Sequence, residues 1–250
     1  MLKTRIIPTL LYRDFGLVKG VKFDSRRAVG GATQAIKVYN MRGVDELVFL
    51  DVTATLQNRP PDFDLIDDLA DDCFMPLTVG GGVRTVDDVR RLLHAGADKV
   101  AVCTAATSDP SLVADAAEQF GSQCIVVSID VATLDGRATA MVRSGTESSG
   151  LDPVDLAVSA QDRGAGEILL QSVDRDGTME GYDLATIRAV TDAVSIPVIA
   201  SGGAGNYPHM AEAVAHGASA VSAASIFHFT EQTPLEAKQY LRSCGVPVRL

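Results

Sequence analysis

Short runs of β-branched and apolar residues alternate with stretches whose apolar residues recur at helical spacing, from one end of the chain to the other. Several of the short runs are apolar at consecutive positions, as at 125–127 (IVV), which is typical of parallel strands covered on both faces. Strands are predicted at 5–10, 46–52, 76–79, 99–103, 124–130, 167–172, 197–201 and 220–224. Helices are predicted at 32–41, 63–71, 85–95, 110–120, 152–163, 183–193, 208–216 and 234–242.

The second half of the chain repeats features of the first at one constant offset. Three segments match with a shift of 121 positions, as from Glu46 to Glu167: ELVFLD with EILLQS, Gly81-Gly82 with Gly202-Gly203, and GADKV at 96–100 with GASAV at 217–221. Duplicated units of alternating strands and helices predict two half-barrels joined into one closed barrel. No linker or low-complexity segment interrupts the pattern. We therefore predict a single (β/α)8 TIM barrel domain over residues 1–250.

Composition restricts the domain size, the cellular compartment and the partners that are expected. The length of 250 residues and the 46% hydrophobic content suit one such barrel. No apolar run approaches the ~18 residues of a membrane span, and residues 1–5 lack the segments of a signal peptide. The four cysteines form no CxxC pair, so we expect reduced thiols and a cytoplasmic protein. A net charge of −10 argues against nucleic acid or an anionic membrane as the main partner.

Two connections are long, 12–31 after the first predicted strand and 131–150 after the fifth. Both follow the carboxyl ends of strands, where barrels of this kind keep their chemistry. Glycines at 16, 20, 30 and 31 would let the first connection move as a lid, and a static surface hairpin is the alternative.

Glycine-rich turns follow the third and seventh predicted strands, and each is followed by a hydroxyl residue after the next strand. Glycine lets backbone N–H groups approach an oxyanion, and a helix N-terminus favours negative charge. One such turn is weak evidence because tight turns use glycine for steric reasons, but two at equivalent places predict an elongated ligand with two phosphates, or a diphosphate. The first cradle comprises Gly81, Gly82 and Thr104, and the second cradle comprises Gly202, Gly203, Ala224 and Ser225.

One strand end differs between the halves. When 124–130 (CIVVSID) is aligned with 5–11 (RIIPTLL), Ser128 corresponds to Thr9 and Asp130 corresponds to Leu11. Two carboxylates facing each other across the carboxyl end of the barrel, called the mouth below, would supply acid and base for proton transfer. Here only Asp130 is present. The alternatives are a capping or loop-bonding role for Asp130 and a core role for Leu11. No cluster of metal-ligand spacing occurs, so no metal is predicted.

Together these segments resemble the HisF family, the cyclase subunit of imidazole glycerol phosphate synthase, over essentially the whole chain. The resemblance implies a barrel that receives ammonia from a docked HisH-like glutaminase, as a heterodimer. The barrel passes the ammonia to a bisphosphorylated substrate and uses no metal or organic cofactor. The motifs are RIIP at 5–8, KG at 19–20, DEL at 45–47, GGG at 80–82, GAGEILL at 164–170, DRDGT at 174–178, ASGGAG at 200–205 and FHF at 227–229.

The same resemblance assigns residues to roles. It implies an ammonia gate at the amino ends of the strands, formed by Arg5, Glu46, Lys99 and Glu167. It implies that Asp98 contacts the glutaminase and that Asp130 is one of two catalytic aspartates. Lys19, Asp51 and Asp176 match polar catalytic positions around the substrate.

Departures from the family pattern gather at the catalytic face. Leu11 stands where the cyclase has its second catalytic aspartate, and losing such a group typically costs ~10²–10⁴ in rate. The other departures are Thr9 for a cysteine, Cys103 for an asparagine, Gln171 for a threonine and Thr146 for a lysine. The pattern indicates that ammonia delivery is retained while the acceptor chemistry has changed.

The segments LL at 10–11, GLVK at 16–19, CFMPL at 73–77 and DRDGTMEG at 174–181 resemble the WbuZ-type, glycosyl amidation-associated branch of the HisF family. That branch implies a glutaminase, a separate ATP-dependent sugar amidotransferase and an acetamidino sugar product for surface polysaccharide. Two alternatives stay open: a working cyclase in which Asp176 or Asp51 covers for the missing carboxylate, and a non-catalytic barrel that only activates a glutaminase.

Overall fold

The apolar runs predicted as strands pair side by side into a closed parallel barrel in the computed structural model, which describes residues 3–250. Each barrel strand pairs in parallel with the next, and the last pairs back onto the first, so that no barrel edge is left unpaired. The predicted (β/α)8 fold is confirmed. In pairing order the strands are β1 (Arg5–Arg13), β4 (Leu47–Asp51), β5 (Leu77–Gly80), β6 (Lys99–Val102), β7 (Ile125–Leu134), β10 (Glu167–Ser172), β11 (Val198–Ser201) and β12 (Ala220–Ala223).

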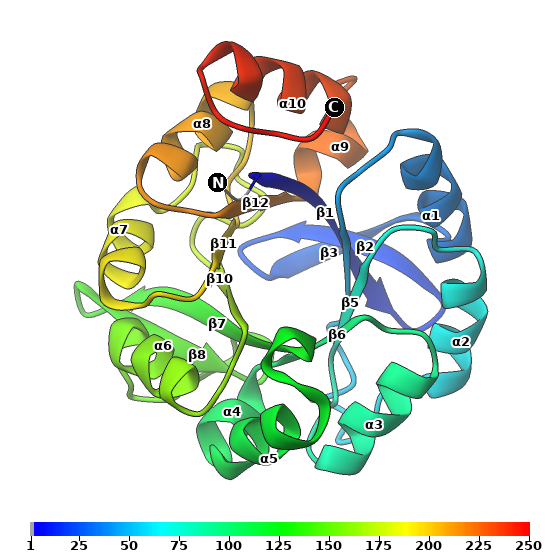
Figure 1. The fold of residues 1–250 in the computed structure, drawn as a ribbon, viewed down its shortest axis with the longest axis vertical. Coiled ribbons are helices and arrows are strands. Elements are labelled where there is room, and N and C mark those ends of the chain that lie inside the picture. The colour runs from blue at the N-terminus through cyan, green and yellow to red at the C-terminus, as the bar shows by residue number, and fades with distance from the viewer. Residues whose placement is uncertain (1–2) are drawn as a thin grey trace.

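Helices form a ring around the outside of the barrel (Figure 1). Their apolar faces pack on the strands, and in most of them a side-chain cap fixes the first turn, as the capping box of Thr85 and Asp88 does in the helix at 86–94. All of the predicted helices are present. They are α1 (Ala32–Met41), α2 (Phe63–Asp71), α3 (Val86–His94), α5 (Ser111–Phe120), α6 (Pro153–Asp162), α7 (Leu184–Ala193), α8 (Tyr207–Ala215) and α10 (Pro234–Ser243).

The half-barrel repeat is present in the structure, and several pairs of elements have the same bounds once shifted. The bounds of β5, β6 and α3, moved by 121 residues, are the bounds of β11, β12 and α8. The same shift relates two short helices that the sequence pattern did not predict, α4 (Thr104–Ser108) and α9 (Ser225–Phe229). Each has 5 residues, which is too short for a helical periodicity to be recognised.

Both long connections are β-hairpins. β1 runs on to Arg13 and pairs with β2 (Gly16–Val21), which pairs with β3 (Asp24–Gly30). β7 likewise runs on to Leu134 and pairs with β8 (Arg137–Val142), followed by β9 (Glu147–Ser148), while a short 3-10 turn, η1 (Ser122–Cys124), precedes β7. The first connection is thus a hairpin, as the static alternative had it, and its movement as a lid stays a prediction. A Cβ at Gly20 would overlap the carbonyl oxygen of Asp24, so this glycine serves a close backbone approach.

Apolar side chains fill the barrel as well as the space around it. The inner cluster, which is separate from the larger cluster under the helices, consists of Ile7, Val48, Ala101, Val126, Leu169, Ile199 and Ala220. The barrel is thus a packed core with two different ends. None of the helices within residues 3–250 is long and apolar enough to cross a membrane.

Candidate functional site

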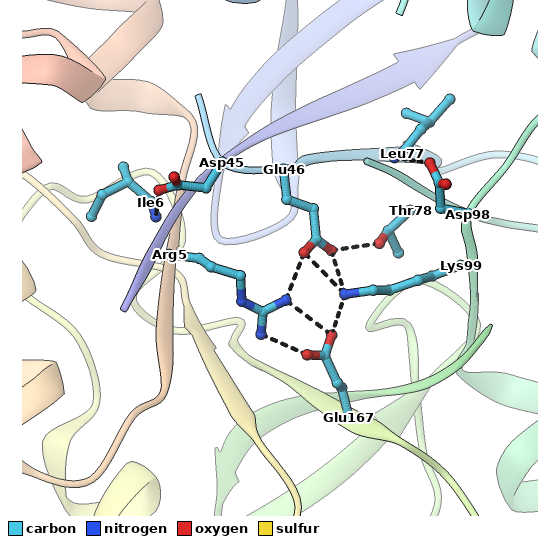
Figure 2. A network of polar contacts seen from close by, with 9 residues as sticks. All are labelled: Arg5, Ile6, Asp45, Glu46, Leu77, Thr78, Asp98, Lys99 and Glu167. Carbon is cyan, nitrogen blue, oxygen red and sulfur yellow. Dashed lines mark hydrogen bonds and ion pairs between the residues drawn. The ribbon is translucent and has the colours of Figure 1, made fainter. Parts of the chain in front are cut away.

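Four charged side chains, three from strands and one from the residue before β4, meet at the amino ends of the barrel strands (Figure 2). Arg5 lies 2.6 Å from carboxylate oxygens of both Glu46 and Glu167. Lys99 Nζ lies 3.0 Å from Glu46 Oε2 and 2.8 Å from Glu167 Oε2. Each cation therefore contacts both anions, and these four residues are named the charged ring below. The structure brings together all four residues that the sequence placed in the gate.

Neutralisation within the charged ring explains why it can be half-buried. Glu46 is 2% exposed, and Thr78 Oγ1 donates a further hydrogen bond of 2.8 Å to its Oε1. Burial lowers the pKa of Arg5, but attraction to Glu167 and Glu46 outweighs it and leaves the pKa raised. Removing one partner would leave a buried charge without compensation.

Two carboxylates that are next in sequence to ring residues accept hydrogen bonds from backbone amides near the charged ring. Asp45 Oδ2 accepts from the Ile6 amide at 2.9 Å, and Asp98 Oδ2 accepts from the Leu77 amide at 2.8 Å. Asp98 is nevertheless exposed, so its other oxygen remains accessible at this face. Behind Asp45 lies Lys238 of α10, whose Nζ is 2.9 Å from Asp45 Oδ1 and 2.8 Å from the carbonyl of Gly43.

Sequence reasoning missed Lys238. Its position on the core-facing side of α10, beside the buried Ala237 and Leu241, was the available signal, because a lysine there needs a buried partner.

The first cradle lies at the opposite, carboxyl end of the barrel, beside a cavity of about 190 Å³. Gly81 and Gly82 have φ of 106° and 77°, which favour glycine, and a Cβ on Gly82 would lie 2.8 Å from the carbonyl oxygen of Arg59. The Thr104 hydroxyl accepts from the Arg143 amide at 2.9 Å, and its own hydrogen is still available to donate. The cavity is also lined by Leu11, Asp51, Cys103, Asp130 and Gln171.

The second cradle borders a much smaller cavity, of about 20 Å³. Gly202, Gly203, Ala224 and Ser225 all line it. Within the described residues, Ser225 Oγ is a buried side-chain atom with no hydrogen-bond partner. Native structures rarely leave such a group unsatisfied, so we expect a water or a polar ligand group to bond this hydroxyl.

Lys19 and Asp176 form part of the wall of the second cavity. Lys19, on β2, is 2% exposed, and its Nζ lies 2.6 Å from both carboxylate oxygens of Asp176, in the loop after β10. The Lys22 amide adds a hydrogen bond of 2.8 Å to the carbonyl of Asp176. These contacts tie the first hairpin to the loop across the mouth.

Asp51 organises the loop after β4. Its Oδ1 accepts from the amides of Thr53 and Ala54 at 2.9 and 3.0 Å, and its Oδ2 lies 2.6 Å from Arg59. The sequence placed Asp51 in a catalytic role. The structure places it on the wall of the first cavity, with both oxygens already hydrogen-bonded.

Strand register shows that Leu11 and Asp130 occupy equivalent positions. Leu11 is paired with Leu50, Asp130 is paired with Gln171, and Leu50 and Gln171 are related by the offset of 121. The asymmetry inferred from the sequence is therefore a property of the barrel mouth. Leu11 and Gln171 line both cavities, so an alkyl group lies between the two cradles.

The environment of Asp130 suits proton transfer near neutral pH. Burial, with a further contribution from Asp176, raises its pKa from 3.8 to about 7, against the lowering effect of Cys103 and Ser128. Cys103 Sγ lies 3.7 Å from Asp130 Oδ2, and the same burial raises the pKa of this thiol.

Asp130 caps none of the described helices, so the capping alternative is wrong. Within residues 3–250, no group of three or more His, Cys, Asp or Glu side chains could hold a metal ion.

A comparison with known protein families places this geometry. The family model described as Histidine biosynthesis protein matches residues 5–233, from the first residue of β1 to the cap of α10. The chain belongs to this family. The histidine biosynthesis family contains HisA- and HisF-like barrel enzymes, which are typically catalytic. This family member is accordingly a HisA/HisF-like barrel, with the charged ring at one end and two glycine-rich cradles at the other.

Proposed function

We propose that this family member is the HisF-like synthase subunit of a glutamine amidotransferase complex. In that complex it conducts ammonia from a HisH-like glutaminase to a phosphorylated acceptor. The observation that carries the proposal is the complete charged ring at the end of the barrel opposite the cradles. A ring whose cations each contact both anions can open by exchanging partners, without leaving any charge unpaired.

The barrel interior supports passage of a neutral molecule. Beyond the charged ring comes the inner apolar cluster, and beyond that come hydroxyl groups, with Thr9 hydrogen-bonded to Ser222 and Ser128 buried nearby. An ammonium ion would lose its hydration in the apolar layer at high cost, whereas ammonia is uncharged. The interior therefore favours ammonia over ammonium and excludes bulk water.

The amino face of the barrel offers a surface for the glutaminase. Two large apolar side chains, Met41 and Phe74, are 81% and 86% exposed there. Asn40 ties their segments together, since its side chain bonds the carbonyl of Asp72 and the amide of Phe74 at 2.6 and 3.1 Å. Exposed apolar groups held in place beside a charge such as Asp98 are typical of a protein interface.

The mouth supports an acceptor other than the cyclase substrate. Cyclase chemistry would need a second base to replace the one absent at Leu11, and Asp51 and Asp176, which each line a cavity with Leu11, are the candidates. Asp51 is held by Arg59 and two amides, and both oxygens of Asp176 are held by Lys19. The acceptor itself is proposed from the resemblance of 10–11, 16–19, 73–77 and 174–181 to the glycosyl amidation-associated branch. We propose sugar amidation, together with a separate sugar amidotransferase, as the reaction served, with an acetamidino sugar of surface polysaccharide as product.

Association with a HisH-type glutaminase tests the partner without knowledge of the acceptor. Asp98→Asn keeps an oxygen for the Leu77 amide but removes the charge, and we expect about tenfold weaker association, as for a charge pair lost at an interface. Calorimetric titration of the glutaminase gives the dissociation constant, and glutamate release gives its stimulation. Asp155→Asn, on α6, is the matched control and should bind as the wild type does. Equal affinities for Asp98→Asn and wild type, or no association at all, would contradict the proposed docking.

A further inference from the structure

The two cradles repeat in sequence but differ in the charge around them. Three arginines line the first cavity: Arg26 on β3, Arg84 after the glycine turn, and Arg143 after β8. The second cavity is lined by one cation, Lys19, which Asp176 neutralises. The repeat alone predicts equal ligands for the two cradles, so this difference calls for its own explanation.

The positive charge of the first cavity is only partly compensated. Among the described residues, Arg26 and Arg84 form no ion pair, and Arg84 Nη1 contacts only the carbonyl of Asn58, at 3.2 Å. Arg143 Nε lies 2.8 Å from Glu147, whose side chain is 60% exposed and outside the cavity lining. Of the two carboxylates that line the cavity, Asp51 is already paired with Arg59. An anionic ligand would therefore meet guanidinium groups with donors to spare.

The first cavity, which carries more positive charge, is also the larger of the two. The second cavity, at about 20 Å³, has room for about one water, while the first, at about 190 Å³, is an order of magnitude larger. A glycine turn and one hydroxyl group supply enough neutral donors for a single phosphoryl group. Three guanidinium groups in addition are more than one phosphoryl group requires, because each can bind phosphate oxygens with two parallel bonds.

We propose that the first cavity binds a diphosphate, with one phosphoryl group on the first cradle and the adjoining one among Arg26, Arg84 and Arg143. The inference deepens the proposed function, on which it rests, by naming the acceptor class as an ester of diphosphate. The glycine turn and Thr104 supply neutral donors to one phosphoryl group. The guanidinium groups balance the added charge of the other.

Calorimetric titration of the purified barrel with inorganic phosphate, inorganic pyrophosphate and fructose 1,6-bisphosphate tests the inference. We expect pyrophosphate to bind at least about tenfold more tightly than phosphate, as for one added charge-assisted contact. It should also bind more tightly than the bisphosphate, whose phosphoryl groups are apart. Equal affinity for phosphate and pyrophosphate, or a bisphosphate that binds as tightly as pyrophosphate, would overturn the inference.

Variants separate the arginine contacts from general charge. Arg26→Gln and Arg84→Gln should each weaken pyrophosphate binding about tenfold and phosphate binding less. Arg188→Gln removes the same charge from the outer face of α7, where it is 58% exposed, and should change neither. Arg84→Lys keeps the positive charge but loses the paired N–H donors of the guanidinium group. It provides a second test if Arg84→Gln fails to fold. Pyrophosphate affinity unchanged in the arginine variants would contradict the site.

The glutaminase titration on the same preparations distinguishes this inference from the proposed function. Glutaminase association without pyrophosphate selectivity would remove the diphosphate site alone. Selectivity without association would remove the proposed complex and leave a diphosphate-binding barrel.

Discussion

At the scale of residues, Asp130 is the group whose chemistry depends most on its surroundings. A carboxyl group with a pKa of about 7 exchanges its proton near neutral pH and could serve as acid or base in one step of a reaction. Its equivalent in the other half is Leu11, which can do neither. Residue types alone located this asymmetry in the sequence, but burial and the neighbouring Asp176 set the pKa, and both depend on the fold.

The raised pKa predicts a pH-dependent cost to stability. In the folded state Asp130 holds its proton up to about pH 7, whereas in the unfolded chain it loses the proton near 3.8. The stability from this group is present below about pH 4 and is lost as the pH rises to about 7. Asp130→Asn removes the dependence. The free energy of unfolding of Asp130→Asn, minus that of wild type, should therefore rise by up to about 4 kcal/mol from about pH 4 to about pH 7. Each unit of pKa shift corresponds to about 1.36 kcal/mol.

Urea denaturation of both proteins at a series of pH values measures the difference. A constant difference between wild type and Asp130→Asn across this range would show that the carboxyl group titrates normally.

At the scale of elements, α10 is fixed to the barrel by a buried ion pair. Lys238 and Asp45 have side chains only 4% and 5% exposed, and Asp45 also holds the Ile6 amide next to Arg5. One carboxylate thus connects the last helix to β1, the strand that carries Arg5 of the charged ring. Helix and ring are expected to lose their order together if the pair is broken.

Lys238→Met should therefore lower the free energy of unfolding by about 3–5 kcal/mol, because Asp45 is left buried without its cation. The control is Arg188→Met, which breaks an exposed pair with Asp192 and should cost less than about 1 kcal/mol. Denaturant unfolding gives both values. Similar losses in the two variants would mean that the pair near the ring contributes no more than a surface contact.

Elements differ in how far the sequence predicts them. Helical spacing predicted the bounds of α1 and α2, since their apolar positions and flanking turns are local signals. The hairpins after β1 and β7 were read as long connections because β2 and β8 are stabilised by pairing with strands that extend past the barrel end. Register of this kind is a tertiary property. The helices α4 and α9 were missed because a single turn has no period.

At the scale of the whole molecule, the barrel separates the end with the charged ring from the end with the two glycine-rich cradles. The repeat predicted the closed barrel and its two cradles, and the ring was predicted as a set from the family resemblance. The sequence could not predict that Lys19 and Asp176 close one cradle, nor that three arginines gather at the other. These arrangements depend on where the first hairpin lies over the mouth. As a result, the two cradles at the mouth differ in charge, while all four residues of the charged ring are in contact at the other end of the barrel.

We propose that the charged ring conducts ammonia while the mouth of the barrel no longer performs the cyclase reaction. Turnover of the cyclase's bisphosphorylated substrate (phosphoribulosyl-formimino-aminoimidazole carboxamide ribotide) with free ammonia tests this most directly, since it needs no partner. Wild type and Leu11→Asp are compared side by side, with Leu11→Asn as the uncharged control. We predict no turnover by wild type or Leu11→Asn, and a gain of at least about 10²-fold over wild type in Leu11→Asp, from the restored acid–base group. Clear turnover by the wild-type protein would contradict the account and assign the chain to the cyclase reaction.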